Sequence, residues 1–125
     1  RSQVVGLEWS PRHQTDQLDA VARKERAVER LERDFQAKLI KDLKRLFPGC
    51  VILKNDSQYK PGILDLTILY GPRWAVLECK KNAKAPARPL QPNYQQRLNR
   101  MSFAAFIYPE NRKEVLDALQ TALRA

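Results

Sequence analysis

Residues 62–81 are the segment that most restricts how this chain can fold. Their sequence, GILDLTILYGPRWAVLECKK, consists of two apolar runs on either side of a Gly-Pro pair, which is typical of an antiparallel β-hairpin. A tight loop at Gly71 and Pro72 pairs positions whose numbers sum to 143. That register predicts that Asp65 lies opposite Glu78, at the ends of the strands farthest from the loop.

Three charged side chains are therefore expected on one face of an apolar hairpin. Because side chains alternate along a strand, Lys80 shares the face of Glu78, while Cys79 points the other way. One interpretation is a solvated outer face, which strands tolerate. However, opposed carboxylates lie about 5 Å apart at Cβ and destabilise a sheet unless positive charge lies between them. Two carboxylates beside an ammonium group instead favour a site for a divalent cation such as Mg²⁺, with the lysine holding an anion.

The composition favours an anionic partner. The chain has 125 residues, enough for one domain with one core, and a formal net charge of +9. Nucleic acid is the first expectation and a membrane surface the second, although the chain lacks a basic amphipathic helix with a strongly aromatic face. No run approaches the roughly 18 to 20 apolar residues of a membrane span. Cys50 and Cys79 lie in apolar runs, which fits buried reduced thiols and a cytosolic protein.

Hydrophobic periodicity predicts an α/β domain with the element order αβββαβα. A helical pattern runs over residues 15–47, as one helix or as two, and ends at Pro48-Gly49. Its apolar positions are Val28, Leu31, Phe35, Leu39, Leu43 and Leu46. Besides the hairpin, strands are expected at residues 50–55 and 102–108, and helices at 93–101 and 110–123.

The N-terminal residues are expected to lie outside this domain. Residues 1–13 carry no periodicity and are predicted to form an arm, with residues 14–125 as the single domain. Trp9, near other apolar residues of the arm, is a candidate for docking on this subunit or on another.

The order of elements and the position of the charged residues closely resemble the PD-(D/E)XK nuclease superfamily. In that family an aspartate opens the second strand and a Glu-x-Lys motif lies on the third, as Asp65 and Glu78-Cys79-Lys80 do here. The resemblance covers about residues 28–124 and implies a restriction-endonuclease-like core, a central mixed sheet flanked by helices. The chain departs from the family's frequent Pro-Asp motif, because Leu64 precedes the aspartate.

This resemblance implies a DNA endonuclease that depends on Mg²⁺ or Mn²⁺. Asp65 and Glu78 would hold the metal ion, joined by the backbone carbonyl of Cys79. Lys80 would act beside the attacked phosphate. One metal ion and two metal ions are both compatible with these residues, and the second ion would need a further carboxylate.

A further carboxylate is expected from the first helix, where many family members place a glutamate. Glu32 lies on the predicted apolar face and is the first candidate catalytic and metal-binding residue, ahead of Glu29 and Asp34. The alternative is a charge at the edge of the face that reaches water. A second candidate is Gln95 in LQPNYQQRL, a segment that looks like a helix start of virus-type replication-repair (VRR-NUC) and junction-resolving nucleases. Gln95 would contact phosphate or a metal-bound water, and the alternative is a solvated helix residue.

The expected DNA contacts follow from the distribution of charge. No acidic residue occurs from Lys80 to Pro109. The cations of this stretch beyond the motif lysine are Lys81, Lys84, Arg88, Arg97 and Arg100, and Tyr59 and Lys60 lie in the loop before the hairpin. A groove lined by these residues would bind phosphates without reading sequence. The alternatives are an ordinary solvated basic surface and, for Tyr59, packing against the protein.

The resulting hypothesis is a structure-selective DNA endonuclease of replication, repair or recombination, encoded by a bacterium or a phage. Cleavage of both strands needs two active sites, which favours a homodimer. The expected location is the cytoplasm or the nucleoid. The alternative is a catalytically inactive DNA-binding module of the same fold, or a subunit of a larger nucleic-acid-processing complex. Against that alternative, the chain retains all three of Asp65, Glu78 and Lys80.

Overall fold

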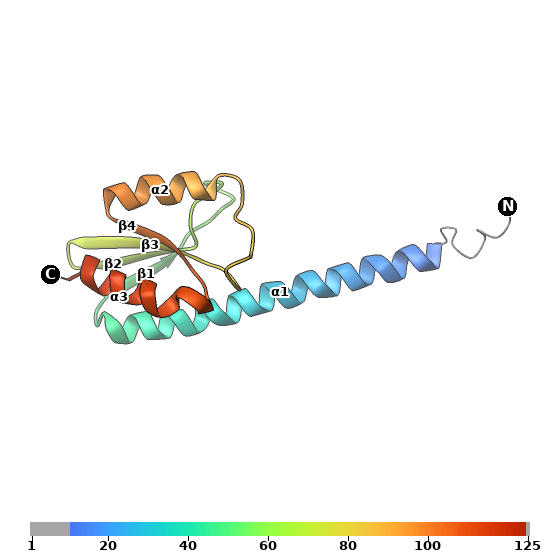
Figure 1. Ribbon diagram of the computed structural model, residues 1–125, viewed down its shortest axis with the longest axis horizontal. Helices are drawn as coiled ribbons and strands as arrows, with labels where there is room; N and C mark the ends of the chain where they lie inside the picture. Colours follow the sequence, from blue (N-terminus) through green and yellow to red (C-terminus); the bar gives the residue numbers. More distant parts are fainter. Residues whose placement is uncertain (1–10, 125) are drawn as a thin grey trace. The chain divides into compact units, whose positions relative to one another are not determined.

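The computed structural model describes residues 11–124, which form a mixed α/β fold around a four-stranded sheet (Figure 1). Within these residues, three α-helices and four strands follow one another in the predicted order αβββαβα. The elements are α1 (Pro11–Leu46), β1 (Val51–Lys54), β2 (Leu66–Tyr70), β3 (Arg73–Cys79), α2 (Gln91–Met101), β4 (Phe103–Ile107), the 3-10 turn η2 (Pro109–Asn111) and α3 (Arg112–Ala122).

The chain divides into two compact units, residues 1–31 and 32–125, with the boundary inside α1. The described part of the first unit is helical from Pro11, so the last three residues of the predicted arm belong to α1. Proline suits the first turn of a helix because that turn leaves its N–H groups unpaired. The remainder of the predicted arm, including Trp9, lies outside the described residues.

Helix α1 is one continuous helix, which is one of the two arrangements expected. Leu31 has the helical spacing of the other apolar residues but is 59% exposed, so it does not belong to the core. The helix first packs against the core at Phe35, one turn later, and Leu39 and Leu43 are fully buried.

The sheet has the strand order β1-β2-β3-β4. The first three strands are antiparallel neighbours, whereas β4 pairs with β3 in parallel after the chain passes through α2. In the hairpin Tyr70 pairs with Arg73 and Leu66 with Leu77, which confirms the register predicted from the Gly-Pro loop. The parallel pair β3 and β4 brings the carboxyl ends of two strands to the same edge of the sheet.

Helices cover both faces of this sheet. On one face, α1 and α3 enclose the larger core, in which Leu43 and Leu119 pack near Ile68 and Leu77. On the other face, α2 covers a smaller cluster of Leu64, Val76 and Ala104, with Trp74, Tyr94 and Leu98 at its margin. Figure 1 shows the resulting layers, with α2 on one side of the strands and α3 on the other. Consecutive residues of β3 therefore face different helices.

A buried carboxylate joins α1 to α3. Asp42 is 5% exposed, and it pairs with Arg45 at 2.7 Å and with Arg112 of α3. Burial raises the pKa of Asp42, but the two guanidinium groups outweigh it and hold this pKa below its ordinary value.

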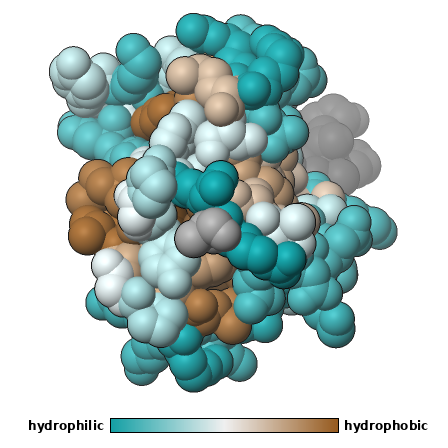
Figure 2. Space-filling view, turned by 90° about the vertical axis from the view of Figure 1, so that its left-hand side faces the viewer, coloured by the Kyte–Doolittle hydropathy of each residue, from teal (hydrophilic) through white to brown (hydrophobic). Residues whose placement is uncertain are grey.

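The edge strand β1 leaves apolar side chains at the surface. Val51 and Leu53 are about half exposed. Figure 2 shows that apolar groups on one face reach the surface as separate patches among polar ones. Such scattered apolar groups are normal for a folded protein and carry no functional inference.

Candidate active site

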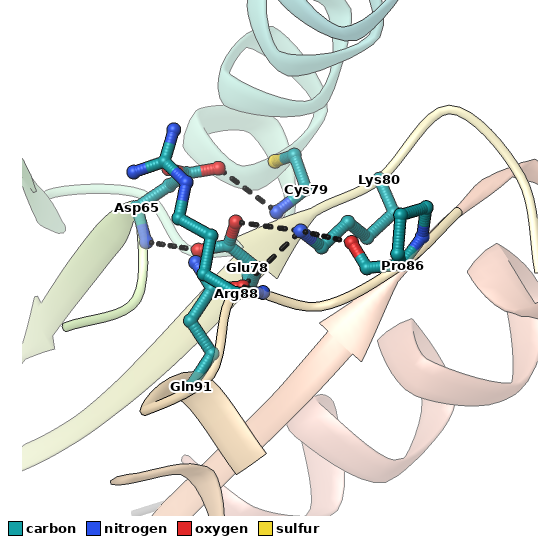
Figure 3. Close-up of polar contacts among 7 residues, drawn as sticks. All are labelled: Asp65, Glu78, Cys79, Lys80, Pro86, Arg88 and Gln91. Atoms are coloured by element: carbon teal, nitrogen blue, oxygen red, sulfur yellow. Dashed lines mark hydrogen bonds and ion pairs between the residues drawn. The ribbon is translucent and has the colours of Figure 1, made fainter. Parts of the chain in front are cut away.

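The carboxylates of Asp65 and Glu78 lie side by side where β2 begins and β3 ends (Figure 3). Each is held by a backbone N–H group from the other segment. The N–H of Asp65 donates to Oε1 of Glu78 at 3.0 Å, and the N–H of Cys79 donates to Oδ2 of Asp65 at 3.1 Å. The hairpin register and this reciprocal pair of hydrogen bonds fix the two acids relative to one another.

The side chain of Lys80 is buried beside these acids. Its Nζ lies 3.4 Å from Oε2 of Glu78 and donates to Oε1 of Gln91 at 3.2 Å and to the carbonyl of Pro86 at 3.3 Å. An ammonium group has three N–H donors, so these three acceptors match its capacity. The motif lysine is therefore held in one orientation next to Glu78.

Among the described residues, Asp65 and Glu78 have only the one positive charge of Lys80 beside them, which does not favour ionisation of both acids. Glu78 is only 4% exposed, and burial together with the neighbouring Asp65 raises its pKa to about 7. Lys80 and a hydrogen bond from Gln91 lower the pKa, but they do not offset the first two effects. A bound cation would supply the missing positive charge.

Cys79 faces away from this pair, as strand alternation requires. Burial and the charges of Asp65 and Glu78 raise the pKa of its thiol far above the ordinary value, so the thiol stays protonated. Its side chain makes a hydrogen bond with Gln36 of α1. Cys79 can therefore contribute to a metal site only through its backbone, which agrees with the carbonyl role expected from the sequence but does not test it.

Glu32 belongs to the environment of Cys79. It is half-buried on α1, while Glu29 and Asp34 are exposed, and its charge also raises the pKa of the Cys79 thiol. No group of three or more His, Cys, Asp and Glu side chains among residues 11–124 is arranged to hold a metal ion. Glu32 thus lies near the site, on the side of the sheet covered by α1, and its role as a metal ligand stays a prediction.

Gln91 is the residue of this site that the sequence analysis missed. It is the first residue of α2, is 1% exposed, and its Oε1 accepts hydrogen bonds from Lys80 Nζ and from the N–H of Arg88 at 3.0 Å. The available signal was its place before Pro92 at a helix start. Gln95, the glutamine that was selected, lies one turn later, and its Nε2 donates to the Ala104 carbonyl at 2.8 Å.

The basic residues predicted to bind DNA differ in exposure and in place. Arg100, in the last turn of α2, precedes the β4 residue that pairs with Ala75 near the start of β3, away from the strand end that carries the acids. Lys81 is half-buried, and the other cations of the predicted DNA-binding set are exposed, namely Lys60, Lys84, Arg88, Arg97 and Arg100. Arg97 lies over the ring of Tyr94, 5.6 Å from its centroid. Tyr59 is 86% exposed, so it does not pack against residues 11–124. These positions leave the side chains accessible to an anionic ligand.

Two loops beside the site touch one another at Gly62. A Cβ atom at this position would lie 2.3 Å from Cβ of Leu90, and the glycine has a φ of +86°, which favours glycine. The loop before Asp65 therefore lies against the residue that precedes Gln91. Arg88 borders a small hollow at this contact, together with Ser57 and Pro61.

Comparison of the chain with family models, with characterised proteins and with solved structures finds no match. The resemblance to PD-(D/E)XK nucleases consequently rests on the residues themselves. Among the described residues, no helix has the length and apolar character needed to cross a membrane.

Proposed function

We propose that this protein is a metal-dependent nuclease that hydrolyses phosphodiester bonds in DNA, with a core of the restriction-endonuclease type. The observation that carries the proposal is the pairing of the half-buried Asp65 with the buried Glu78 beside Lys80, in which one lysine does not balance two acids. A purely structural role would not explain why two carboxylates are held together by backbone hydrogen bonds at the end of a sheet.

The two carboxylates fit a hard divalent cation. Mg²⁺ is commonly bound through one or two carboxylates and retains several waters and substrate oxygens, so a third acidic side chain is not required. Asp65 and Glu78 would hold the ion, with the Cys79 carbonyl as an additional oxygen ligand. When bound, the metal ion supplies an activated water and positive charge for the phosphate.

The protein's own groups would perform three tasks. Asp65 and Glu78 would hold the metal ion at a fixed place on the sheet, and so the phosphate bound to it, because their backbone partners keep both carboxylates in position. Lys80 would place its positive charge beside a non-bridging phosphate oxygen and would exchange its contact with Glu78 for that oxygen, while Gln91 keeps the ammonium group in position. Glu32 would add negative charge near the metal ion from the side of the sheet that α1 covers.

The charge of the protein supports DNA as the substrate. The stretch from Lys80 to Pro109 contains no acidic residue, and its exposed cations all follow Lys80 in the sequence. Sequence-independent contacts to phosphates would give binding that weakens steeply with salt. A domain of this size has little room for reading bases, which favours selection of DNA structure. The homodimer and the location in the cytoplasm or nucleoid stay predictions.

The test is incubation of the protein with labelled linear, flap and four-way DNA in the presence of Mg²⁺, Mn²⁺ or EDTA. We expect cleavage that requires the metal ion and that is lost in Asp65→Asn. Salt-sensitive DNA binding without cleavage under any of these metal conditions would instead identify the inactive DNA-binding module. Absence of both binding and cleavage would contradict both functions.

A further inference from the structure

A cavity of about 430 Å³ lies beside the candidate active site. Lys80 forms one part of its wall, and the remainder comes from the loop after β3, from Gln95 of α2 and from residues at and after the end of β4. The N–H of Lys80 donates to the carbonyl of Ile107 at 2.9 Å, so the parallel strands stay paired up to the edge of the cavity. Crevices beyond the carboxyl ends of parallel strands are common ligand sites.

The cavity wall is neutral and mostly apolar, apart from Lys80. Its loop side is formed by small residues, including Ala83, Ala85 and Ala87, and its floor includes the half-buried Phe106 and Tyr108. No acidic residue lines it within the described part of the chain. A wall of this kind suits a flat, uncharged ring system better than a second phosphate.

Two amide groups give the cavity hydrogen-bonding capacity. Asn82 uses its Oδ1 to accept the N–H of Lys84, and Gln95 uses its Nε2 to donate to Ala104. Within residues 11–124, Nδ2 of Asn82 and Oε1 of Gln95 make no hydrogen bond. Neither atom is among the buried atoms that lack a partner, so both are accessible to solvent. One donor and one acceptor therefore remain free at an apolar, partly aromatic wall. Nucleobases present both kinds of group along their edges.

We propose that this cavity binds the base of an unpaired nucleotide adjoining the phosphate held at Lys80. The proposal rests on the proposed nuclease function and specifies its substrate. A base within a duplex cannot enter a cavity without leaving the stack, and the free-energy cost of leaving is smallest for a base that is already single-stranded. The cavity would thus select flaps, single strands and open junctions over continuous duplex.

The experiment uses the full chain carrying Asp65→Asn, which should prevent cleavage without closing the cavity. Flap and single-stranded DNA would carry 2-aminopurine at successive positions, with continuous duplex for comparison. We expect a fluorescence change at one position next to the bound phosphate, in the flap and single strand only. Ala85→Leu, added to the same protein, should fill the cavity, abolish this change and weaken flap binding about tenfold, with duplex binding unchanged.

The matched control is Ala118→Leu, the same substitution at an exposed position of α3 outside the cavity. It should leave both signals unchanged. If Ala85→Leu fails to fold by circular dichroism, Ala87→Leu fills the same cavity from the exposed side of the loop. Equal loss of flap and duplex binding, or flap binding without any fluorescence change, would overturn the assignment of the cavity.

A second measurement separates this proposal from the nuclease function. Titration with deoxynucleoside monophosphates, followed by NMR, should shift the signals of Ala83 and Tyr108 in the parent and not in Ala85→Leu. Such shifts without any DNA cleavage would leave a nucleotide site and refute the nuclease. Cleavage of DNA without these shifts and without the 2-aminopurine signal would leave the nuclease and refute the cavity.

Discussion

Asp42 and Glu78 are both buried carboxylates, but their surroundings shift their pKa values in opposite directions. Asp42 is 5% exposed and Glu78 is 4% exposed. Two guanidinium groups surround Asp42 and hold its pKa below the ordinary value, whereas burial and Asp65 raise the pKa of Glu78 to about 7. Burial alone therefore does not mark a site.

What distinguishes the two regions is whether the protein itself neutralises the acid. At the contact of α1 and α3 it does, because Arg45 and Arg112 both pair with Asp42. At the end of β3 it supplies one lysine for two acids. Uncompensated buried charge is costly, and it is retained in proteins mostly where it serves binding or catalysis. The comparison thus separates an acid that joins two helices from an acid pair whose charge the protein balances only in part, as the proposed metal site requires.

The largest expected effect is on cleavage. Asp65→Asn and Glu78→Gln should each lower the rate by at least about 100-fold, because they remove a charge that holds the metal ion. In metal-free buffer, Asp65→Asn should melt no lower than the parent, since it relieves repulsion between the two acids. Asp42→Asn should show the reverse pattern, with near-normal cleavage and a melting temperature several degrees lower. Quantitative gel assays and thermal melts would check both.

These paired variants can break the comparison directly. Parent-like cleavage by pure Asp65→Asn would refute the site. Loss of cleavage in a folded Asp42→Asn protein would show that the contact of α1 and α3 also serves the chemistry.

The next effect is on the pH dependence of stability without metal. The folded pKa of Glu78 is raised from 4.5 to about 7, so the folded state keeps a proton that the unfolded state releases. This group's contribution is fully present below about pH 4.5 and is lost as the pH rises to about 7, a change of roughly 3 kcal/mol. Glu78→Gln should lack this loss. Denaturant unfolding of both proteins across this range would measure the difference.

Asp42 provides the opposite sign in the same experiment. Its folded pKa is lowered, so its contribution is present above the ordinary aspartate pKa and is lost only as the pH falls below it. A parent protein whose stability rises steadily from pH 4.5 to 7 relative to Glu78→Gln would contradict the assigned environment of Glu78.

A smaller effect is expected from the acids of α1. Glu32→Gln should lower the cleavage rate about tenfold and raise the Mg²⁺ concentration needed, because the charge of Glu32 acts on Cys79 at the end of β3, next to the proposed metal ligands. Glu29→Gln, an exposed residue of the same helix, is the matched control and should change little. Rates measured over a range of Mg²⁺ would check this, and equal small effects of both variants would place the site on the hairpin alone.

The smallest effect concerns the exposed cations. Reversing the charge of Lys84 and Arg88 should weaken binding to all DNA of one shape by a similar factor, without changing turnover of the bound complex. The slope of log affinity against log salt should flatten by about one for each phosphate that the variant no longer binds. Binding curves at several salt concentrations, with Asp65→Asn to prevent cleavage, would measure it. An unchanged slope would assign these two residues to ordinary surface.

Sequence periodicity predicted the hairpin well because its register depends on local features alone. A two-residue loop and alternating side chains determine that Asp65 faces Glu78, whatever packs on the sheet. The order of helices and strands was likewise predicted from periodicity, which reports which side of an element is apolar.

Periodicity does not show which part of an apolar helix face is covered by the rest of the protein. Leu31 has the correct spacing and is exposed, because the core contacts of α1 begin only at Phe35. Gln91 was missed for a related reason. Its importance depends on contacts with Lys80 and with the backbone of Arg88, which become neighbours only after the chain has folded. A polar residue that acts through tertiary contacts leaves no pattern in its own segment.

The contact of Gly62 with Leu90 has a consequence for how this sequence can diverge. Gly49 has the same positive φ, but no atom lies within 4 Å of a Cβ placed there, so asparagine can replace it at modest cost. At Gly62 any side chain would meet Leu90, including its backbone. Descendants of this chain that keep both loops should therefore drift at position 49 while position 62 remains glycine, and a lineage that loses this glycine should also have remodelled the segment leading into α2.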